Sequence, residues 1–250
     1  MQILLCDSCH PEEVAANCHS FGVGIEAQSF FDPSYLESKP QAIEQHRNLL
    51  SGIVPQSMHG AFGDLIPASF DPLVRSIAEL RLHASYETAR RLGVQHIVYH
   101  HGYVPGHSMP EPWLKRSIQF WSAFLEGHSG VKIHVENVLE RDESLLANLV
   151  DEIGSPELDI CLDVGHCHCH SRMTPPQWIR ALGERIAYVH LHNNDGAGDQ
   201  HRAIFDGTLP MRETLDALLE FAPNAIWALE TSPADGVRSM HWLEEQGYRK

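Results

Sequence analysis

The stretch PLVRSIAELRLHASYETARRLGVQHIVYHHG, residues 72–102, is one unit of the repeat that decides the fold. In residues 72–93 the apolar residues recur at intervals of three and four, which is typical of an amphipathic helix, and Gly93 is placed to end it. Residues 96–101 form a short apolar run that predicts a buried strand, and this strand ends in histidine. A helix therefore leads into a strand whose last residues are ionisable.

The same alternation of strand-like runs and helix-period segments extends through the chain without a linker or a low-complexity stretch. Eight such units in 250 residues match the size and period of a closed barrel of eight β/α units. We therefore expect an α/β fold with a single (β/α)8 TIM-barrel domain over residues 1–250. The expected strands lie near residues 2–7, 22–28, 53–59, 96–101, 132–138, 158–164, 186–193 and 225–231. The expected helices lie near residues 11–21, 40–51, 72–93, 111–127, 141–153, 175–184, 210–221 and 236–247.

An open, doubly wound sheet is the alternative fold for such a pattern. It would normally carry a glycine-rich phosphate loop after the first strand, and the sequence there, CDSCHPEE at residues 6–13, is not one. The closed barrel is therefore favoured.

Composition limits the partners that we expect. With 18 basic and 33 acidic residues the formal net charge is −15, which repels polyanions and offers no counterion release on DNA, so nucleic acid is not an expected partner. No run approaches the roughly 18 apolar residues that a membrane span requires. The first residues, MQILLCDSCHPEE, lack the basic region of a signal peptide. We expect a cytoplasmic protein without membrane association.

The cysteines form no recognisable structural zinc motif. Cys6 and Cys9 make one CxxC pair, without a second pair at zinc-ribbon spacing, and it closes a strand rather than opening a helix. Cys167 and Cys169 alternate with histidines in GHCHCHS, residues 165–171. We expect free cysteines in a reducing compartment, with a second metal or redox site as the alternative.

Histidine and acidic residues stand repeatedly where the predicted strands end. In a TIM barrel these ends and the loops that follow them build the active site. Imidazole and carboxylate groups that converge in this way predict a metal site at the C-terminal mouth of the barrel. The candidate ligands are His59, His100, Glu136, Asp163, His166, His190, Glu230 and, in the loop DQH, Asp199 and His201.

These ligand types also indicate which ions to expect. Nitrogen and oxygen donors suit zinc, manganese, cobalt or iron, and a set without thiolates favours a catalytic site with open positions. Side chains two apart share one face of a strand, so His134 and Glu136 should both point into the barrel, as should His190 and His192. Buried carboxylates need a compensating charge, and among the strand runs Lys132 alone offers one, which favours bound cations.

The residues at these strand ends resemble those of the xylose isomerase-like TIM-barrel superfamily over about residues 20–235. This superfamily includes sugar and sugar-phosphate isomerases and epimerases, and also the second family of apurinic/apyrimidinic endonucleases. The matching motifs are MHG (58–60), YHHG (99–102), VENV (135–138), LDVGH (162–166), VHLHNNDG (189–196), DQH (199–201) and LET (229–231).

The resemblance implies two ways of using the site. In the sugar epimerases one metal is held by two Glu, one Asp and one His, which correspond here to Glu136, Asp163, His190 and Glu230. The endonuclease-like members hold three metals and add further ligands. Those correspond here to His59, His100, His166, Asp199 and His201. We therefore expect one to three divalent ions in each chain.

The first functional hypothesis is a divalent-metal-dependent isomerase or epimerase of a sugar or sugar phosphate, acting through a metal-stabilised enediolate. Glu136 and Glu230 would then move the proton as base and acid, and His166 would hold a substrate hydroxyl. The second hypothesis is a multi-metal phosphoester hydrolase, acting on a small phosphorylated substrate rather than on duplex DNA. The third is a non-catalytic metal-binding barrel.

Overall fold

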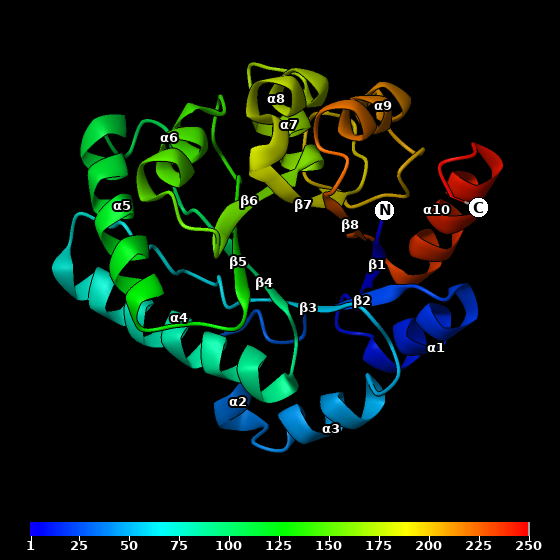
Figure 1. Ribbon diagram of the computed structural model, residues 1–250, viewed down its shortest axis with the longest axis horizontal. Coiled ribbons are helices and arrows are strands. Elements are labelled where there is room, and N and C mark those ends of the chain that lie inside the picture. The colour runs from blue at the N-terminus through cyan, green and yellow to red at the C-terminus, as the bar shows by residue number, and fades with distance from the viewer. Residues whose placement is uncertain (250) are drawn as a thin grey trace.

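The computed structural model describes residues 1–249 and confirms the predicted TIM barrel; the last position of the expected domain, residue 250, lies outside the described residues. Eight parallel strands close into a ring in chain order, with the helices around them (Figure 1). The strands are β1 (Ile3–Cys6), β2 (Gly24–Ala27), β3 (Gln56–His59), β4 (His96–His100), β5 (Lys132–Glu136), β6 (Leu158–Asp163), β7 (Ile186–Leu191) and β8 (Ile226–Leu229).

The predicted helices are present, and each connects one strand to the next or follows the last. They are α1 (Pro11–Phe21), α3 (Ala42–Leu49), α4 (Pro72–Leu92), α5 (Pro110–Glu126), α6 (Ser144–Ile153), α8 (Pro175–Leu182), α9 (Met211–Phe221) and α10 (Pro233–Glu245). Three short segments were not predicted: α2 (Tyr35–Ser38), α7 (Val164–His170) and a 3-10 turn (Gly183–Arg185).

Local sequence explains where α4 and α8 begin and end. The Asp71 carboxylate accepts a hydrogen bond from the backbone N–H of Leu73 at the start of α4, and Gly93 ends the helix at a φ of 83°, where a side chain would be strained. Thr174 and Gln177 form a capping box at the start of α8, with Pro175 in its first turn.

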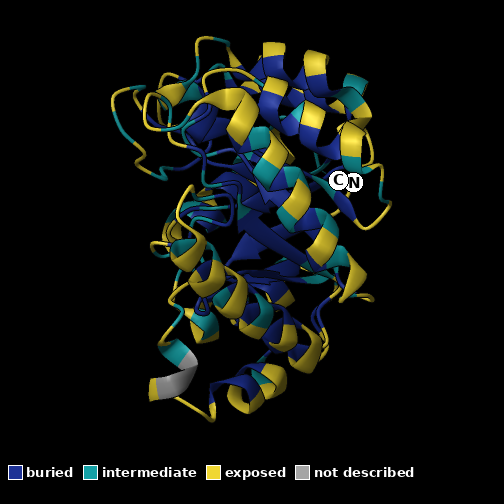
Figure 2. Ribbon diagram, turned by 90° about the vertical axis from the view of Figure 1, so that its left-hand side faces the viewer, coloured by how far each residue is buried: buried dark blue, intermediate teal, exposed yellow. Residues whose placement is uncertain are grey.

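The apolar core has two parts that follow from the alternation of side chains along each strand. Outward-facing residues such as Ile25, Ile97 and Val135 pack against the helices, whose outer faces are exposed while the strands are buried (Figure 2). A smaller cluster fills the inside of the barrel. It consists of Leu4, Cys6, Val98, Cys161, Tyr188, Ile226 and Ala228. Beyond this cluster, polar side chains of the strands gather toward the C-terminal mouth, while His96 and His134 form a separate pair, 3.0 Å apart, nearer the other end.

The segment directly after β6, which carries His166, is one of the three that were not predicted. It forms helix α7 directly, because the Asp163 side chain caps the helix and accepts a hydrogen bond from the backbone N–H of His166. Cys167 and Cys169 therefore lie on different faces of a helix, with Cys167 buried. All six cysteines are free.

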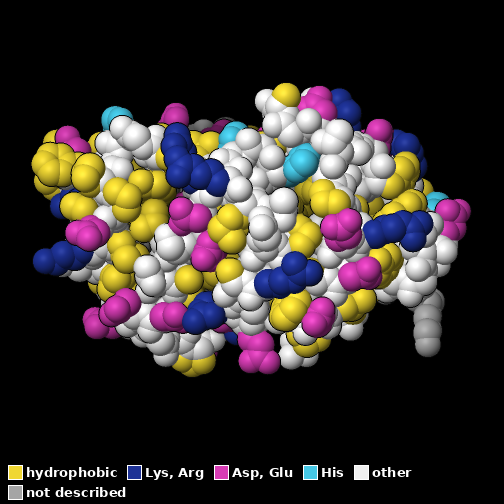
Figure 3. All heavy atoms as spheres, turned by 90° about the horizontal axis from the view of Figure 1, so that it is seen from above, with side chains coloured by type: hydrophobic (Ala, Val, Ile, Leu, Met, Phe, Trp, Pro, Cys, Tyr) yellow, Lys and Arg dark blue, Asp and Glu magenta, His cyan; other side chains and the backbone are white. Residues whose placement is uncertain are grey.

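The surface charge agrees with the acidic composition of the chain. On the face shown in Figure 3, lysine and arginine side chains stand singly among acidic and apolar ones. Within residues 1–249, no helix combines the length and the apolar character needed to cross a membrane.

Candidate metal centre

Strand register places the predicted ligands beside one another at the C-terminal mouth. His100 pairs with Glu136 across β4 and β5, and Asp163 pairs with His190 across β6 and β7. His59 is the last residue of β3, and Glu230 follows the last residue of β8. His166 lies on α7, and the loop after β7 carries Asp199 and His201.

Three carboxylates face one imidazole nitrogen at the centre of this group. Nδ1 of the fully buried His190 lies 3.3 Å from Glu136 Oε1, 3.3 Å from Glu230 Oε2 and 3.9 Å from Asp163 Oδ2. Burial alone would lower the pKa of His190, but the acidic groups around it raise that pKa well above its usual range. These four residues are the set expected to hold a single metal.

The Glu136 carboxylate joins this set to further imidazoles. Its Oε2 atom lies 3.1 Å from His59 Nε2 and 3.5 Å from His100 Nε2, while Oε1 lies 3.4 Å from His166 Nδ1. Burial would raise the pKa of Glu136, but the surrounding imidazoles, His190 and His100 first, hold it well below the usual range. Burial lowers the pKa of His100 to about 3, so its ring is neutral and able to donate a lone pair.

The loop after β7 completes the cluster. Asp199 Oδ2 lies 2.8 Å from His201 Nε2 and 3.3 Å from His166 Nε2, and His201 Nδ1 lies 3.8 Å from Glu230 Oε2. His201 adopts a left-handed backbone conformation, with a φ of 46°, that a non-glycine residue rarely takes. All nine predicted ligands are therefore linked in one network of contacts.

Three residues that the predicted ligand set omits also belong to this network. Glu26, on β2, lies 3.1 Å from His190 Nε2, and Gln28 donates a hydrogen bond to Glu230 at 2.6 Å. His192 donates to both Asp163 oxygens at 3.1 Å. Glu26 is an acid inside an apolar strand run, which is an unusual place for a carboxylate. It was not among the predicted ligands because it stands before the expected end of that strand. His192 was correctly expected to point inward.

The donor set fits a divalent cation. Glu230 Oε2 is buried and receives no hydrogen bond from any described residue, so one lone pair remains free beside His190 Nδ1. The described ion pairs join the carboxylates of this cluster to imidazoles alone. Donor atoms of His59, His100 and Glu136 lie within 4.8 Å of one another, and so do those of His59, His190 and Glu230. Both spacings suit a shared ion.

Two buried thiols lie near the cluster. Cys6 Sγ lies 3.4 Å from Glu26 Oε1, and Cys161 belongs to a group with Glu136 and His190. Burial raises the pKa of both thiols well above the usual range, so in the absence of a cation they are protonated and are weak donors. The nine predicted ligands are all nitrogen and oxygen donors.

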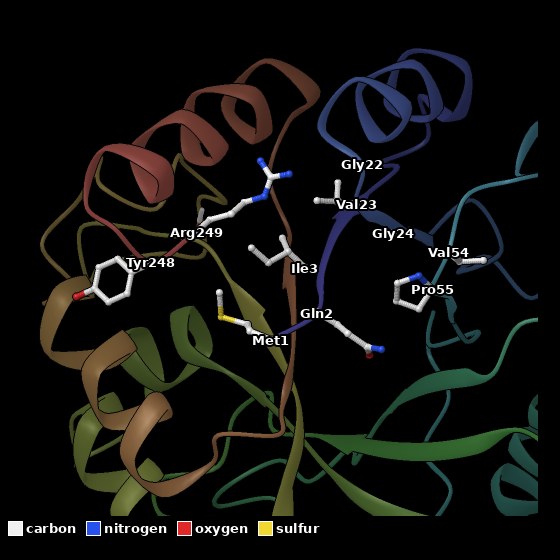
Figure 4. A pocket seen from close by; sticks show the side chains of 10 residues that line it. All are labelled: Met1, Gln2, Ile3, Gly22, Val23, Gly24, Val54, Pro55, Tyr248 and Arg249. Atoms are coloured by element: carbon white, nitrogen blue, oxygen red, sulfur yellow. The ribbon is translucent and has the colours of Figure 1, made fainter.

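A cavity of about 480 Å³ lies at the other end of the barrel. Its lining includes Ile3, Gly24 and Pro55, which lie at or just before the first residues of β1, β2 and β3, together with Tyr248 and Arg249 near the C-terminus (Figure 4). The Arg249 side chain donates to the Phe21 carbonyl, so it is tied to the end of α1. This cavity is separate from the candidate metal centre, which occupies the C-terminal strand ends.

Comparison with known proteins agrees with the fold. The uncharacterized protein MJ1311 of Methanocaldococcus jannaschii is 30% identical over 207 residues, which cover 75% of this chain and 68% of the relative. The solved structure of the TTHB071 protein from Thermus thermophilus, soaked with ZnCl2, is 26% identical, with a TM-score of 0.79 over 100% of both chains.

A D-tagatose 3-epimerase-like protein is 24% identical, with a TM-score of 0.80 over 98% of this chain and 96% of the other, a likeness that shows the shared fold. Other solved structures of this fold include L-ribulose 3-epimerase, which is 19% identical, with a TM-score of 0.72 over 100% of this chain and 88% of the other. Residues 15–246 match the family model described as xylose isomerase-like TIM barrel. The chain therefore belongs to the xylose isomerase-like TIM barrel family.

Proposed function

We propose that this protein is a divalent-metal-dependent isomerase or epimerase of a sugar or sugar phosphate. The observation that carries the proposal is the convergence of Glu136, Asp163 and Glu230 on Nδ1 of His190, at 3.3, 3.9 and 3.3 Å respectively. Sugar epimerases occur among the structures that share this fold, which supports the same class of reaction. Zinc, manganese, cobalt and iron all suit this set of donors.

These four residues would hold the cation. When bound, it would polarise the carbonyl and hydroxyl oxygens of a hydroxy-ketone or hydroxy-aldehyde as a Lewis acid. This would favour loss of the proton on the hydroxyl-bearing carbon next to the carbonyl. The protein's own contribution is to hold one carboxylate oxygen, Glu230 Oε2, beside that carbon without a competing hydrogen bond. Glu230 Oε2 has none from the described residues, so it is free to accept a proton.

Glu136 and Glu230 would act as the proton-transfer pair. They belong to β5 and to the residue after β8, so they reach His190 from strands on either side of β7. One carboxylate would accept the carbon-bound proton and the other would return a proton to the opposite face of the same carbon, which inverts the centre. Return of the proton to the neighbouring carbon, with transfer of the hydroxyl proton to the former carbonyl oxygen, would instead move the carbonyl. The His166 ring donates through Nδ1 to the Asn137 carbonyl, at 2.9 Å. Its Nε2 would then face a substrate hydroxyl beside Asp199.

Two measurements test this proposal. Metal analysis of anaerobically purified protein is expected to find about one transition-metal ion per chain. Ketopentoses, ketohexoses and their phosphates, incubated with the protein in D₂O, should yield one substrate with enzyme-dependent deuterium at the carbon next to the carbonyl. If the protein holds no metal, and added zinc or manganese neither binds nor raises Tm, the proposal is wrong.

A second candidate function, a multi-metal phosphoester hydrolase, is favoured by one specific feature. The two oxygens of Glu136 face different imidazoles, with His59 and His100 at Oε2 and His166 and His190 at Oε1. Glu136, with His59 and His100 on one side and His166 and His190 on the other, would then help to hold more than one cation. The chemistry that such ions would supply is activation of a water molecule and stabilisation of the leaving oxygen of a small phosphorylated substrate.

Stoichiometry and product separate the two candidates. Two or three ions per chain, with release of nitrophenol from bis-(p-nitrophenyl) phosphate and no deuterium exchange into sugars, would identify the hydrolase. One ion per chain with exchange and no release would identify the isomerase or epimerase.

A further inference from the structure

Glu26 is a wholly buried carboxylate that lies next to the proposed ligands without belonging to them. It accepts hydrogen bonds from the Tyr188 hydroxyl at 2.7 Å and from Gln28 Nε2 at 3.1 Å, and the Cys6 thiol lies 3.4 Å away. Its two oxygens lie 3.2 and 3.1 Å from His190 Nε2. A buried carboxylate with this many partners has a fixed position, because any movement would break several hydrogen bonds.

The two nitrogens of the His190 ring have different surroundings. Nδ1 faces Glu136, Glu230 and Asp163, while the carboxylate that faces Nε2 is Glu26. A neutral imidazole carries one proton, and the hydrogen bond made by one nitrogen determines which nitrogen keeps a lone pair. A proton on Nε2, donated to Glu26, leaves the lone pair on Nδ1.

We propose that Glu26 is a positioning residue: by accepting the Nε2–H of His190, it sets the tautomer and the ring orientation that present Nδ1 to a divalent cation. This inference rests on the metal centre of the proposed function. Carboxylates that hold a ligating histidine in this way raise its basicity and restrict its orientation. Gln28 extends the arrangement, since the same amide nitrogen donates to Glu26 and, at 2.6 Å, to Glu230.

The alternative role for Glu26 is that of a metal ligand, because Cys6, Glu26 and His190 also lie close enough to share an ion. That arrangement would use Nε2 of His190 and leave its protonated Nδ1 toward the three carboxylates. It would also displace Tyr188 and Gln28 from the Glu26 oxygens, where both donors already have good hydrogen-bond distances. The geometry therefore favours positioning over ligation.

The decisive variant is E26Q. Glutamine has the same shape but no charge, and because both Glu26 oxygens lie within 3.2 Å of His190 Nε2, its NH₂ places a donor beside that nitrogen in place of one carboxylate oxygen. The Tyr188 hydroxyl keeps Ser57 as a partner at 2.7 Å. Zinc affinity, measured by competition with a chromophoric chelator, is expected to fall by about 10-fold to 100-fold. The number of ions bound at saturation should not change.

E140Q is the matched control. Glu140 is a second buried carboxylate paired with an imidazole, His101, at 2.8 Å, and its other oxygen accepts from the backbone N–H of Val138. This substitution makes the same chemical change in a buried Glu–His pair outside the ligand set. Zinc affinity of E140Q should stay within about twofold of the wild type. Unfolding of both variants in chelator separates loss of stability from loss of affinity.

Each result decides the inference. Wild-type affinity in E26Q, or a decrease no larger than in E140Q, would overturn it, and loss of one bound ion at saturation would make Glu26 a ligand instead. If E26Q does not fold, the imidazole ¹H–¹⁵N NMR spectrum of zinc-loaded wild-type protein tests the inference instead. The ring proton of His190, identified through its contact with Tyr188, is expected on Nε2. A proton on Nδ1 would refute the inference. A wild-type chain that binds no zinc would refute the proposed function itself.

Discussion

The Asp163 carboxylate accepts a hydrogen bond of 2.6 Å from the backbone N–H of His166, so one side chain both starts helix α7 and faces the candidate metal centre. The cap fixes the first turn of the helix, and that turn brings the His166 ring to 3.4 Å from Glu136. A local helix-capping preference thus decides the position of a candidate ligand.

The two roles of Asp163 can be separated by substitution. D163N keeps a good capping oxygen but removes the charge, so we expect a folded protein with metal affinity reduced by at least tenfold. D163A removes the cap as well, which should cost a further 1 kcal/mol or so in the free energy of unfolding in chelator. Equal stability of the two variants in denaturant titrations would show that the cap contributes nothing.

Glu136 lies within ion-pair distance of four other predicted ligands, so its substitution should weaken metal binding in the whole centre. We expect E136Q to retain no transition metal after dialysis and to lose detectable deuterium exchange, because the neutral amide cannot replace a carboxylate between four imidazoles. Metal content measured by mass spectrometry checks this, with E140Q as the control. Unchanged metal content in E136Q would exclude Glu136 as a ligand.

Gly165 leaves room for the ring of His192. A Cβ atom at this position would lie 1.9 Å from His192 Cε1, so G165A must displace the ring that donates to Asp163, or the backbone of α7. We expect the free energy of unfolding to fall by about 1–3 kcal/mol, as for other overpacked sites. G198A is the control, because a Cβ atom there meets nothing within 4 Å. Matched stability of the two variants would contradict the steric argument.

The ion pair between His201 and Asp199 predicts a pH dependence for protein kept in chelator. Burial alone would lower the pKa of His201, but Asp199 and Glu230 raise it to about 9, against about 6.5 for an unfolded chain. The folded state therefore holds this proton more tightly. The resulting stabilisation is complete below pH 6.5 and is lost as the pH rises through 9. H201Q should flatten this part of the stability curve; the same slope in both proteins would refute the pairing.

With zinc in excess the trend should reverse over the same interval. A ligating imidazole must be neutral, so the increase in Tm caused by zinc should grow from pH 6.5 to pH 9. Thermal unfolding at fixed zinc concentration measures this directly. An increase that shrinks over that interval would show that proton release is not coupled to binding.

Much of the fold was predictable because it depends on local patterns. The intervals of three and four in residues 72–92, ended by Gly93, predicted α4 almost to the residue. Each of the eight expected strands was found within a few residues of its expected bounds. Helix α7 was missed because its seven residues, VGHCHCH, have no apolar period, and its start depends on a cap made by a residue of the preceding strand.

The candidate site was predictable to the extent that strand ends converge in a barrel. Residues such as His59, His100 and Glu136 could be grouped from their place at the ends of strands, before any distance was known. Glu26 could not be assigned to this group from the sequence, because nothing in the sequence of β2 shows that its carboxylate reaches the His190 ring on β7. That contact depends on the closure of the barrel, which brings β2 and β7 to the same interior.

The sequence by itself determined the order of helices and strands and the chemical types of side chain at each strand end, since both follow from periodicity and from the rule that parallel strands end on one side. The tertiary structure alone decided which atoms meet. It placed three carboxylates at Nδ1 of His190 and a fourth, from Glu26, near Nε2. The physical reason is that ring orientation, hydrogen-bond direction and desolvation depend on neighbours distant in the chain, and these are set only when the barrel closes.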